Sequence, residues 1–266
     1  MGSLIPPQTE SAATGHFIEF RNVSKAFDDH VVLDDVSFFV DHAETCVIMG
    51  RSGVGKSVTL KHILGFLKPD SGRVLVAGED ITDWNEAQLT EIRRRVTMVF
   101  QSGALFDSLT VAENIAFPLE TRKDLTDEQK ESRVAELGEM LEVTPILEKL
   151  PSELSTGMKR AVAIARALAQ DPEAILYDEP TTMVDPLMAA HTGDLILRLK
   201  EKFHKTSVVV THDTHLAKKL ADRIVFLHEG RVAYFGPWAG FVAAPEPFLR
   251  NFIRQDELVP ELDVTT

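Results

Sequence analysis

The 266-residue sequence contains a single cysteine, Cys46, and this scarcity excludes two kinds of small protein. A disulfide framework needs pairs of cysteines, and a zinc cluster needs several such ligands at fixed spacing. Cys46 begins an apolar run at residues 46–49, where a small buried residue is far commoner than a reactive thiol. We therefore expect Cys46 to belong to a hydrophobic core.

The sequence also lacks an apolar run of the roughly 18 to 20 residues that a membrane-spanning helix requires. Its first residues, Met1–Pro6, have neither the apolar segment of a secretory signal nor the serine or threonine that N-myristoylation requires. From these absences we expect a cytosolic chain that reaches a membrane only through another protein.

Basic residues are few, since 28 lysines and arginines stand against 41 acidic residues and give a formal net charge of −13. Proteins that bind nucleic acid usually carry a basic face, so we expect no nucleic acid partner. The hydrophobic fraction of 44% is typical of a globular protein with a well-filled core. A chain of this length has room for one large α/β domain and a small subdomain.

The strongest motif is the glycine-rich stretch at residues 50–57, GRSGVGKS. It follows the apolar run and precedes a helical pattern, so a strand, a loop and a helix are expected in the order that a phosphate-binding loop requires. An ordinary glycine turn would match this pattern by chance in roughly one chain in a hundred of this length. We expect the backbone N–H groups and the helix start to bind phosphate, Lys56 to reach the β- and γ-phosphates, and Ser57 to hold Mg²⁺. The expected nucleotide-binding residues of this segment are Gly50, Arg51, Ser52, Gly53, Val54, Gly55, Lys56, Ser57 and Val58.

Around this loop, the sequence pattern predicts short strands first and helices later. Residues 1–15 are expected to form a loose tail. Residues 17–20, 31–33 and 36–40 have the pattern of an antiparallel sheet, with Phe27 as either a core residue or an exposed platform for a base. Residues 103 to about 168 are mostly helical in pattern, and helices are also expected at 84–95 and from about 187 to 203.

Polar residues follow three further apolar strands: Gln101 after 96–100, Asp178 and Glu179 after 174–177, and His212 after 207–211. In a parallel sheet the carboxyl ends of the strands meet at one edge, where ligands bind. Two adjacent acids at a strand end are costly unless a cation or a reacting group needs them. We therefore expect Asp178 to hold Mg²⁺ and Glu179 to be the base that polarises a water.

In order and spacing, these motifs resemble those of the ATP-binding-cassette (ABC) ATPases. The match consists of the glycine loop, Gln101, LSTGM at 154–158, ILYDEP at 175–180, Asp185 and VVVTHD at 208–213. The resemblance implies an α/β fold, with a P-loop core of mixed, mainly parallel sheet and helices, an N-terminal antiparallel β subdomain and an inserted helical subdomain at about 103–168. It implies a cassette domain at 16–246, followed by a C-terminal tail at 247–266 whose amphipathic pattern is compatible with a dimer contact.

The resemblance also implies a role for each motif in ATP hydrolysis with Mg²⁺. Phe27 would stack on adenine, His212 would steady the γ-phosphate, and Gln101 would contact the metal and the attacking water. The expected catalytic residues are thus Glu179, His212 and Gln101, and the expected metal ligands are Ser57, Gln101 and Asp178. Ser155, Thr156 and Gly157 would contact a nucleotide held by a second copy, which implies a homodimer, and Asp185 is a further expected nucleotide-binding residue. Taken alone, Ser155–Gly157 is explained as a helix N-cap.

A narrower resemblance is to the ATPase subunits of Mla/Mce-type phospholipid transport systems. It rests on residues 101–106 and 111–119, on Met158, and on the late segment 247–252. It implies an integral membrane permease and a periplasmic MCE-type lipid-binding protein as partners, with the chain peripheral to the cytoplasmic face of a bacterial inner membrane. Open alternatives are transport of an amino acid, an ion or an organic solvent, and a soluble cassette protein that acts on ribosomes or DNA.

The sequence departs from the usual ABC pattern at three positions. Thr156 and Met183 stand where the family usually has glycine, and Val58 stands where a threonine often follows the loop serine. None of these changes removes a charged group. We expect them to affect the turnover rate and the tightness of the dimer, and to leave the class of reaction unchanged.

Overall fold

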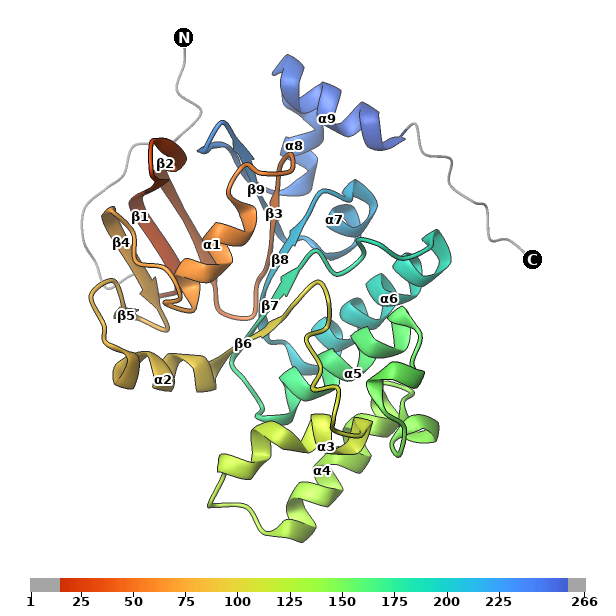
Figure 1. The fold of residues 1–266 in the computed structure, drawn as a ribbon. Coiled ribbons are helices and arrows are strands. Elements are labelled where there is room, and N and C mark those ends of the chain that lie inside the picture. The colour runs from red at the N-terminus through yellow and green to blue at the C-terminus, as the bar shows by residue number, and fades with distance from the viewer. Residues whose placement is uncertain (1–14, 258–266) are drawn as a thin grey trace.

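The computed structural model describes residues 15–257, which form two sheets with helices packed around them (Figure 1). The expected tail at 1–15 and the end of the chain beyond residue 257 lie outside the described residues, apart from Gly15. The mixed α/β architecture, with a separate antiparallel sheet near the N-terminus, is the fold class that the sequence predicted.

The smaller sheet is antiparallel and has the strand order β2-β1-β4-β5. Its strands are β1 (His16–Phe27), β2 (His30–Asp41), β4 (Ser71–Val76) and β5 (Glu79–Asp80). The prediction of separate strands at 31–33 and 36–40 was wrong, because β2 runs through the polar pair at 34–35. Asp35 takes a positive φ of 55°, and register shifts between β1 and β2 absorb the irregularity without ending the strand.

The larger sheet has the strand order β10-β9-β3-β8-β7-β6, and its first pair is antiparallel while the others are parallel. The strands are β3 (Thr45–Met49), β6 (Val96–Val99), β7 (Ala174–Asp178), β8 (Thr206–Thr211), β9 (Arg223–His228) and β10 (Arg231–Gly236). The carboxyl ends of β3, β8, β7 and β6 therefore lie side by side along one edge. This edge is where the sequence analysis expected the site.

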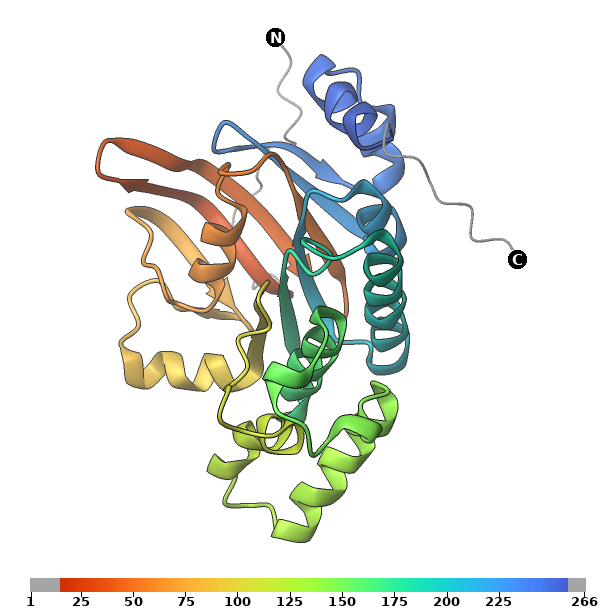
Figure 2. The ribbon, with the colours of Figure 1, turned by 45° about the vertical axis from the view of Figure 1, so that its right-hand side comes forward.

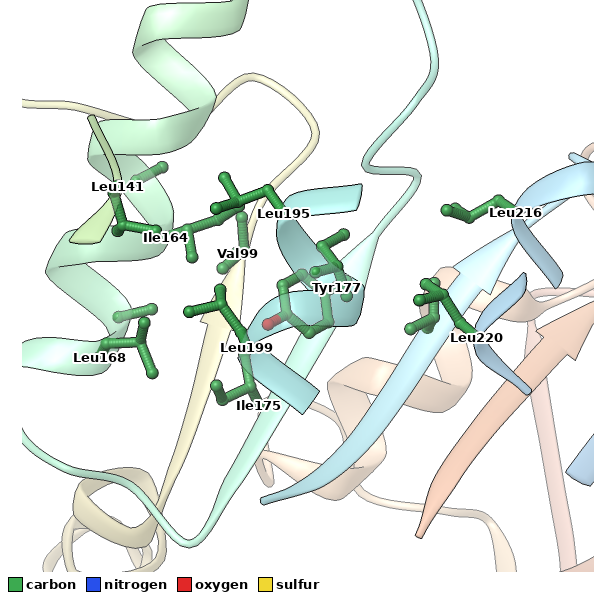
Figure 3. Packing of buried hydrophobic residues seen from close by; sticks show 14 of the residues in the cluster. Val99, Leu141, Ile164, Leu168, Ile175, Tyr177, Leu195, Leu199, Leu216 and Leu220 are labelled. Atoms are coloured by element: carbon green, nitrogen blue, oxygen red, sulfur yellow. The ribbon is translucent and has the colours of Figure 1, made fainter. Parts of the chain in front are cut away.

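Alternation along the central strand β3 divides the core between the two faces of this sheet. Val47 and Met49 belong to one buried cluster, which β3 shares with the helices on that face. Figure 3 shows other members of this cluster, among them Ile164, Tyr177 and Leu195. Cys46 and Ile48 point the other way, into a cluster shared with the antiparallel sheet and α1. All four side chains are fully buried, so β3 is held from both faces, and the loop that follows it has a fixed starting point.

The helices follow the sequence pattern closely. They are α1 (Lys56–Ile63), α2 (Glu86–Arg95), α3 (Val111–Ala116), α4 (Asp127–Met140), α5 (Thr156–Ala169), α6 (Pro186–Phe203), α7 (Thr214–Leu220), α8 (Trp238–Ala243) and α9 (Pro247–Glu257). The segment from 103 to 168 contains α3, α4 and α5, of which α3 and α4 lie at one end of the molecule (Figures 1 and 2). Within residues 15–257, none of the helices combines the length and the apolar character that crossing a bilayer demands.

Helix α9 accounts for the amphipathic pattern at 247–257 within this one chain. Leu249 is fully buried, Ile253 is 9% exposed, and the ring of Phe252 lies 4.9 Å from that of Phe226 in β9. The apolar face of α9 therefore packs on the core of its own chain, and its amphipathicity requires no second copy. The dimer contact expected of this tail stays a prediction.

Candidate functional site

The glycine loop is held between β3 and α1 in a shape that side chains would prevent. Gly50 has φ +147°, and a Cβ there would lie 2.5 Å from the carbonyl oxygen of Leu227. Gly55 has φ +106°, and a Cβ there would lie 2.7 Å from Leu33. The sequence therefore needs glycine at both positions, because the loop bends tightly against neighbouring strands. Helix α1 begins directly after it, with the positive end of its dipole toward the loop.

A cavity of about 670 Å³ lies over this loop, at the carboxyl edge of the large sheet. Most of the residues expected at the site line it, although they come from distant parts of the chain. The lining residues are Phe27, His30, Val32, Arg51, Ser52, Gly53, Gly55, Lys56, Ser57, Val58, Gln101, Glu179, Thr182 and His212. The cavity has space for a nucleotide-sized ligand. Phe27, for which the sequence left two possibilities open, is 42% exposed at the end of β1 and is thus a surface ring.

Lys56 and Glu179 face each other across the base of the cavity. The Lys56 Nζ atom lies 3.4 Å from Glu179 Oε1 and donates hydrogen bonds to the carbonyl oxygens of Gly50, at 2.9 Å, and Arg51, at 3.1 Å. The lysine side chain is only 6% exposed. The loop cation is thus folded back onto its own loop and onto the carboxylate.

Two further groups hold the other oxygen of Glu179. His212 Nδ1 lies 2.9 Å from Glu179 Oε2, and the Thr182 hydroxyl donates to the same oxygen at 3.0 Å. Burial raises the pKa of Glu179, but the hydrogen bond with His212, the charge of Lys56 and the Thr182 hydroxyl together outweigh it and leave the pKa below its ordinary value. Glu179 is therefore ionised at neutral pH, which is the form that could accept a proton.

Asp178 and Ser57 form the part of the site that fits Mg²⁺. The Ser57 hydroxyl donates to Asp178 Oδ1 at 2.9 Å, which places two hard oxygen donors beside the loop. Burial raises the pKa of Asp178, and the neighbouring charge of Glu179 raises it further, against the hydrogen bond from Ser57. A carboxylate in this environment gains from a cation. Mg²⁺ commonly takes one or two carboxylates together with phosphate oxygens, so a hydroxyl and one carboxylate beside a phosphate-binding loop fit this ion.

The remaining expected residues do not line this cavity. Ser155 caps α5, its hydroxyl accepting a hydrogen bond from the Met158 N–H at 3.3 Å, and Asp185 caps α6 in the same way. Gly157 lies against the start of α6, so closely that a Cβ there would be 1.9 Å from Met188 Cε. Thr156 is the first residue of α5 and is exposed. These four residues lie together around the starts of α5 and α6, at a place separate from the cavity lining.

Sequence reasoning missed three residues of the cavity, namely His30, Val32 and Thr182. Thr182 carried a usable signal, since a hydroxyl three residues after a left-handed Glu179, with φ +48°, can turn back onto its carboxylate. His30 and Val32 carried none, because their place depends on how the β1–β2 hairpin bends over the loop. Gly50 and Val54 belong to the loop without lining the cavity, and Asp178, at the end of β7, does not line it either.

Together the fold and the site define a P-loop nucleotide-binding protein with a carboxylate, Glu179, beside the loop lysine. The family model described as ABC transporter matches residues 33–182, and the chain belongs to this family. Two solved structures carry the same fold. One, titled as the dimeric post-hydrolysis state of the ATP-binding cassette MJ0796 bound to ADP and Pi, has a TM-score of 0.75 and 34% identity, over 83% of this chain and 98% of that one. The other, cbiO1 from Clostridium perfringens, has a TM-score of 0.80 and 26% identity, over 92% and 96%.

The curated relatives are named as ATP-binding proteins of transport systems for different substrates. The probable ribonucleotide transport ATP-binding protein mkl of Mycobacterium leprae is 33% identical over 246 residues, which are 92% of this chain and 71% of the relative. The methionine import ATP-binding protein MetN of Bifidobacterium longum is 38% identical over 239 residues, 88% of this chain and 59% of the relative. The chain is therefore an ATPase subunit of an ABC transporter, with ATP and Mg²⁺ as its ligands.

Proposed function

We propose that this chain drives phospholipid transport between membranes, as a homodimer bound to an integral membrane permease. The observation that carries the ATPase part is the meeting of Lys56, Glu179 and His212 in one cavity. The lipid assignment is supported by the Mla/Mce-like segments at 101–106 and 111–119. A periplasmic MCE-type lipid-binding protein would then be a further partner, and the chain would lie at the cytoplasmic face of the inner membrane.

In the proposed mechanism, Glu179 takes a proton from a water, whose oxygen attacks the γ-phosphorus as the bond to the β–γ bridging oxygen breaks. ADP and phosphate leave. His212 holds Glu179 through Oε2, and Lys56 moves its charge from Glu179 Oε1 to the phosphate oxygens. Ser57 and Asp178, together with Gln101, would hold Mg²⁺, whose chemistry would be to neutralise charge on the phosphates. Phe27 offers its exposed ring to the adenine.

The homodimer is supported by the separation of the two halves of the expected site. Ser155, Thr156, Gly157 and Asp185 lie away from this chain's cavity, at two exposed helix starts that can face a nucleotide held by a second copy. Beside them Met158, Met183 and Leu187 are 42%, 84% and 66% exposed. An apolar surface of this kind is suited to burial against a partner when the dimer closes.

The permease contact is supported by a second, apolar groove of about 460 Å³ between the sheet and the α3 region. Four phenylalanines line this groove and are each 40% to 50% exposed: Phe66, Phe100, Phe106 and Phe117. Rings left open beside the segment that follows Gln101 give a short membrane-protein helix a place to dock. A shift of this groove on docking would be passed to the nucleotide cavity through Gln101, which lines the cavity and directly follows Phe100 of the groove.

The ATPase and dimer parts are tested by Glu179→Gln. The variant keeps the size of the side chain and removes the base, so we expect unchanged ATP binding, ATP hydrolysis reduced by about 10²- to 10⁴-fold, and a dimer trapped by ATP. Light scattering after size exclusion, with and without ATP, measures the dimer. A variant that stays monomeric with ATP under conditions where the wild type hydrolyses it would count against the composite site.

The substrate is tested by transfer assays with the membrane protein that co-purifies with this chain. ATP-dependent movement of a fluorescent phospholipid between vesicles is expected. The alternative, supported by the names of the relatives, is uptake of a ribonucleotide or methionine, and the same vesicles loaded with ATP would detect it. Co-purification with ribosomes or DNA and no membrane protein would argue for a soluble cassette protein.

A further inference from the structure

Arg160, in the second turn of α5, is a buried cation that has no carboxylate partner among residues 15–257. Its side chain is 4% exposed. One guanidinium nitrogen donates to the carbonyl oxygen of Pro180 and the other to that of Thr182, while Nε has no hydrogen-bond partner within the described part of the chain. Burial lowers the pKa of the guanidinium. Burying a charge whose only partners are carbonyl oxygens costs free energy of folding, so we expect this arginine to perform a function in the site.

The two carbonyls that Arg160 holds belong to the turn directly after Glu179. This turn contains two residues other than glycine in the left-handed region, Glu179 with φ +48° and Met183 with φ +64°. Such conformations persist only where their surroundings hold them. In the same turn the Thr182 hydroxyl donates to Glu179 Oε2. The guanidinium therefore fixes the backbone of Thr182, whose side chain orients the carboxylate.

Arg160 also joins this turn to the helix start at Ser155–Gly157. It lies four residues after Thr156 on the same helix, and Gly157 lies against the Met188 side chain of α6, the helix that follows the turn. A forked guanidinium that donates to two carbonyls transmits a shift of the helix more stiffly than a single hydrogen bond would. The start of α5 and the base thus share one rigid connection.

We propose that Arg160 is a positioning residue that holds Glu179 in place for ATP hydrolysis and makes its position depend on that of the α5 start. The proposal rests on the function proposed above. A purely structural reading, in which Arg160 only fastens α5 to the turn, predicts loss of stability with no specific effect on turnover. The two readings separate when turnover and nucleotide affinity are measured in the same variants.

The test compares Arg160→Gln and Arg160→Lys with Lys159→Gln, which removes a charge from the next position of the same helix. We expect Arg160→Gln to lower kcat by about ten- to a hundredfold, since small misplacements of a reacting group have effects of this size. The dissociation constant for a fluorescent ATP analogue should stay within about twofold. Arg160→Lys should recover part of kcat, because its single nitrogen retains the charge but replaces the fork poorly. Lys159→Gln should behave as the wild type.

Thr182→Val supplies the second measurement, because it removes the hydroxyl without removing a charge. If Arg160 acts through Thr182, the double variant Arg160→Gln/Thr182→Val should have about the same kcat as the slower single variant. If the two residues act independently, the fold reductions in kcat of the two single variants should multiply. Wild-type kcat in folded Arg160→Gln would overturn the proposal. If that variant does not fold, wild-type kcat in Arg160→Lys would do so. Wild-type protein that hydrolyses no ATP would refute the proposed function instead.

Discussion

Replacing Lys56 with alanine should separate the two tasks that this side chain performs. Its ammonium group donates to two carbonyl oxygens of the loop and lies 3.4 Å from Glu179 Oε1. With nucleotide bound, the same group would serve the β- and γ-phosphates. The variant therefore loses contacts in both states, and the effect on binding is the difference between them.

The magnitude follows from counting these contacts. Two charge-assisted hydrogen bonds to phosphate oxygens contribute roughly 3 to 6 kcal/mol. The contact with Glu179 given up on binding offsets part of this, so we expect the lower end of the range, an affinity about a hundredfold weaker. The free protein should lose only about 1 to 3 kcal/mol of stability, because His212 and Thr182 still hold the carboxylate.

Titration with a fluorescent ATP analogue measures the affinity, and urea unfolding without nucleotide measures the stability. Lys61→Ala is the matched control, since Lys61 lies on the same helix, is exposed, and can lose its charge without touching the loop. If Lys56→Ala binds the analogue as tightly as Lys61→Ala does, then Lys56 is not the phosphate ligand, and the assignment of the loop fails.

Three further outcomes are expected. Burial lowers the pKa of His62, so the unfolded chain binds a proton more readily than the folded protein does. The contribution of His62 to stability is therefore complete above about pH 6.5 and falls as the pH drops toward the folded pKa. His62→Gln should reduce this loss, measured by thermal melts at pH 7.5 and 5.5. Leu249→Ala should lower the free energy of unfolding, measured in urea, by about 2 to 3 kcal/mol, because this side chain of α9 is fully buried. Thr156→Gly should raise ATP turnover severalfold at unchanged affinity for nucleotide, if the β-branched residue hinders the approach of a second copy.

The sequence predicted those site residues that stand at the carboxyl ends of parallel strands. Buried parallel strands read as short apolar runs, and the first polar residue after each run must emerge at the same edge. Gln101, Glu179 and His212, predicted on this ground to lie together, line one cavity. The prediction requires only that the strands be parallel neighbours in one sheet, because their carboxyl ends then lie at the same edge.

What the sequence could not supply was the choice of partner for each side chain. The pairing of Lys56 with Glu179 joins two parts of the chain that are far apart in sequence, and a local motif does not reveal such a contact. The continuity of β2 through Asp35 depends on bulges in its pairing with β1, which local propensity does not reveal. Likewise, the burial of Leu249 on its own chain depends on where α9 turns after α8.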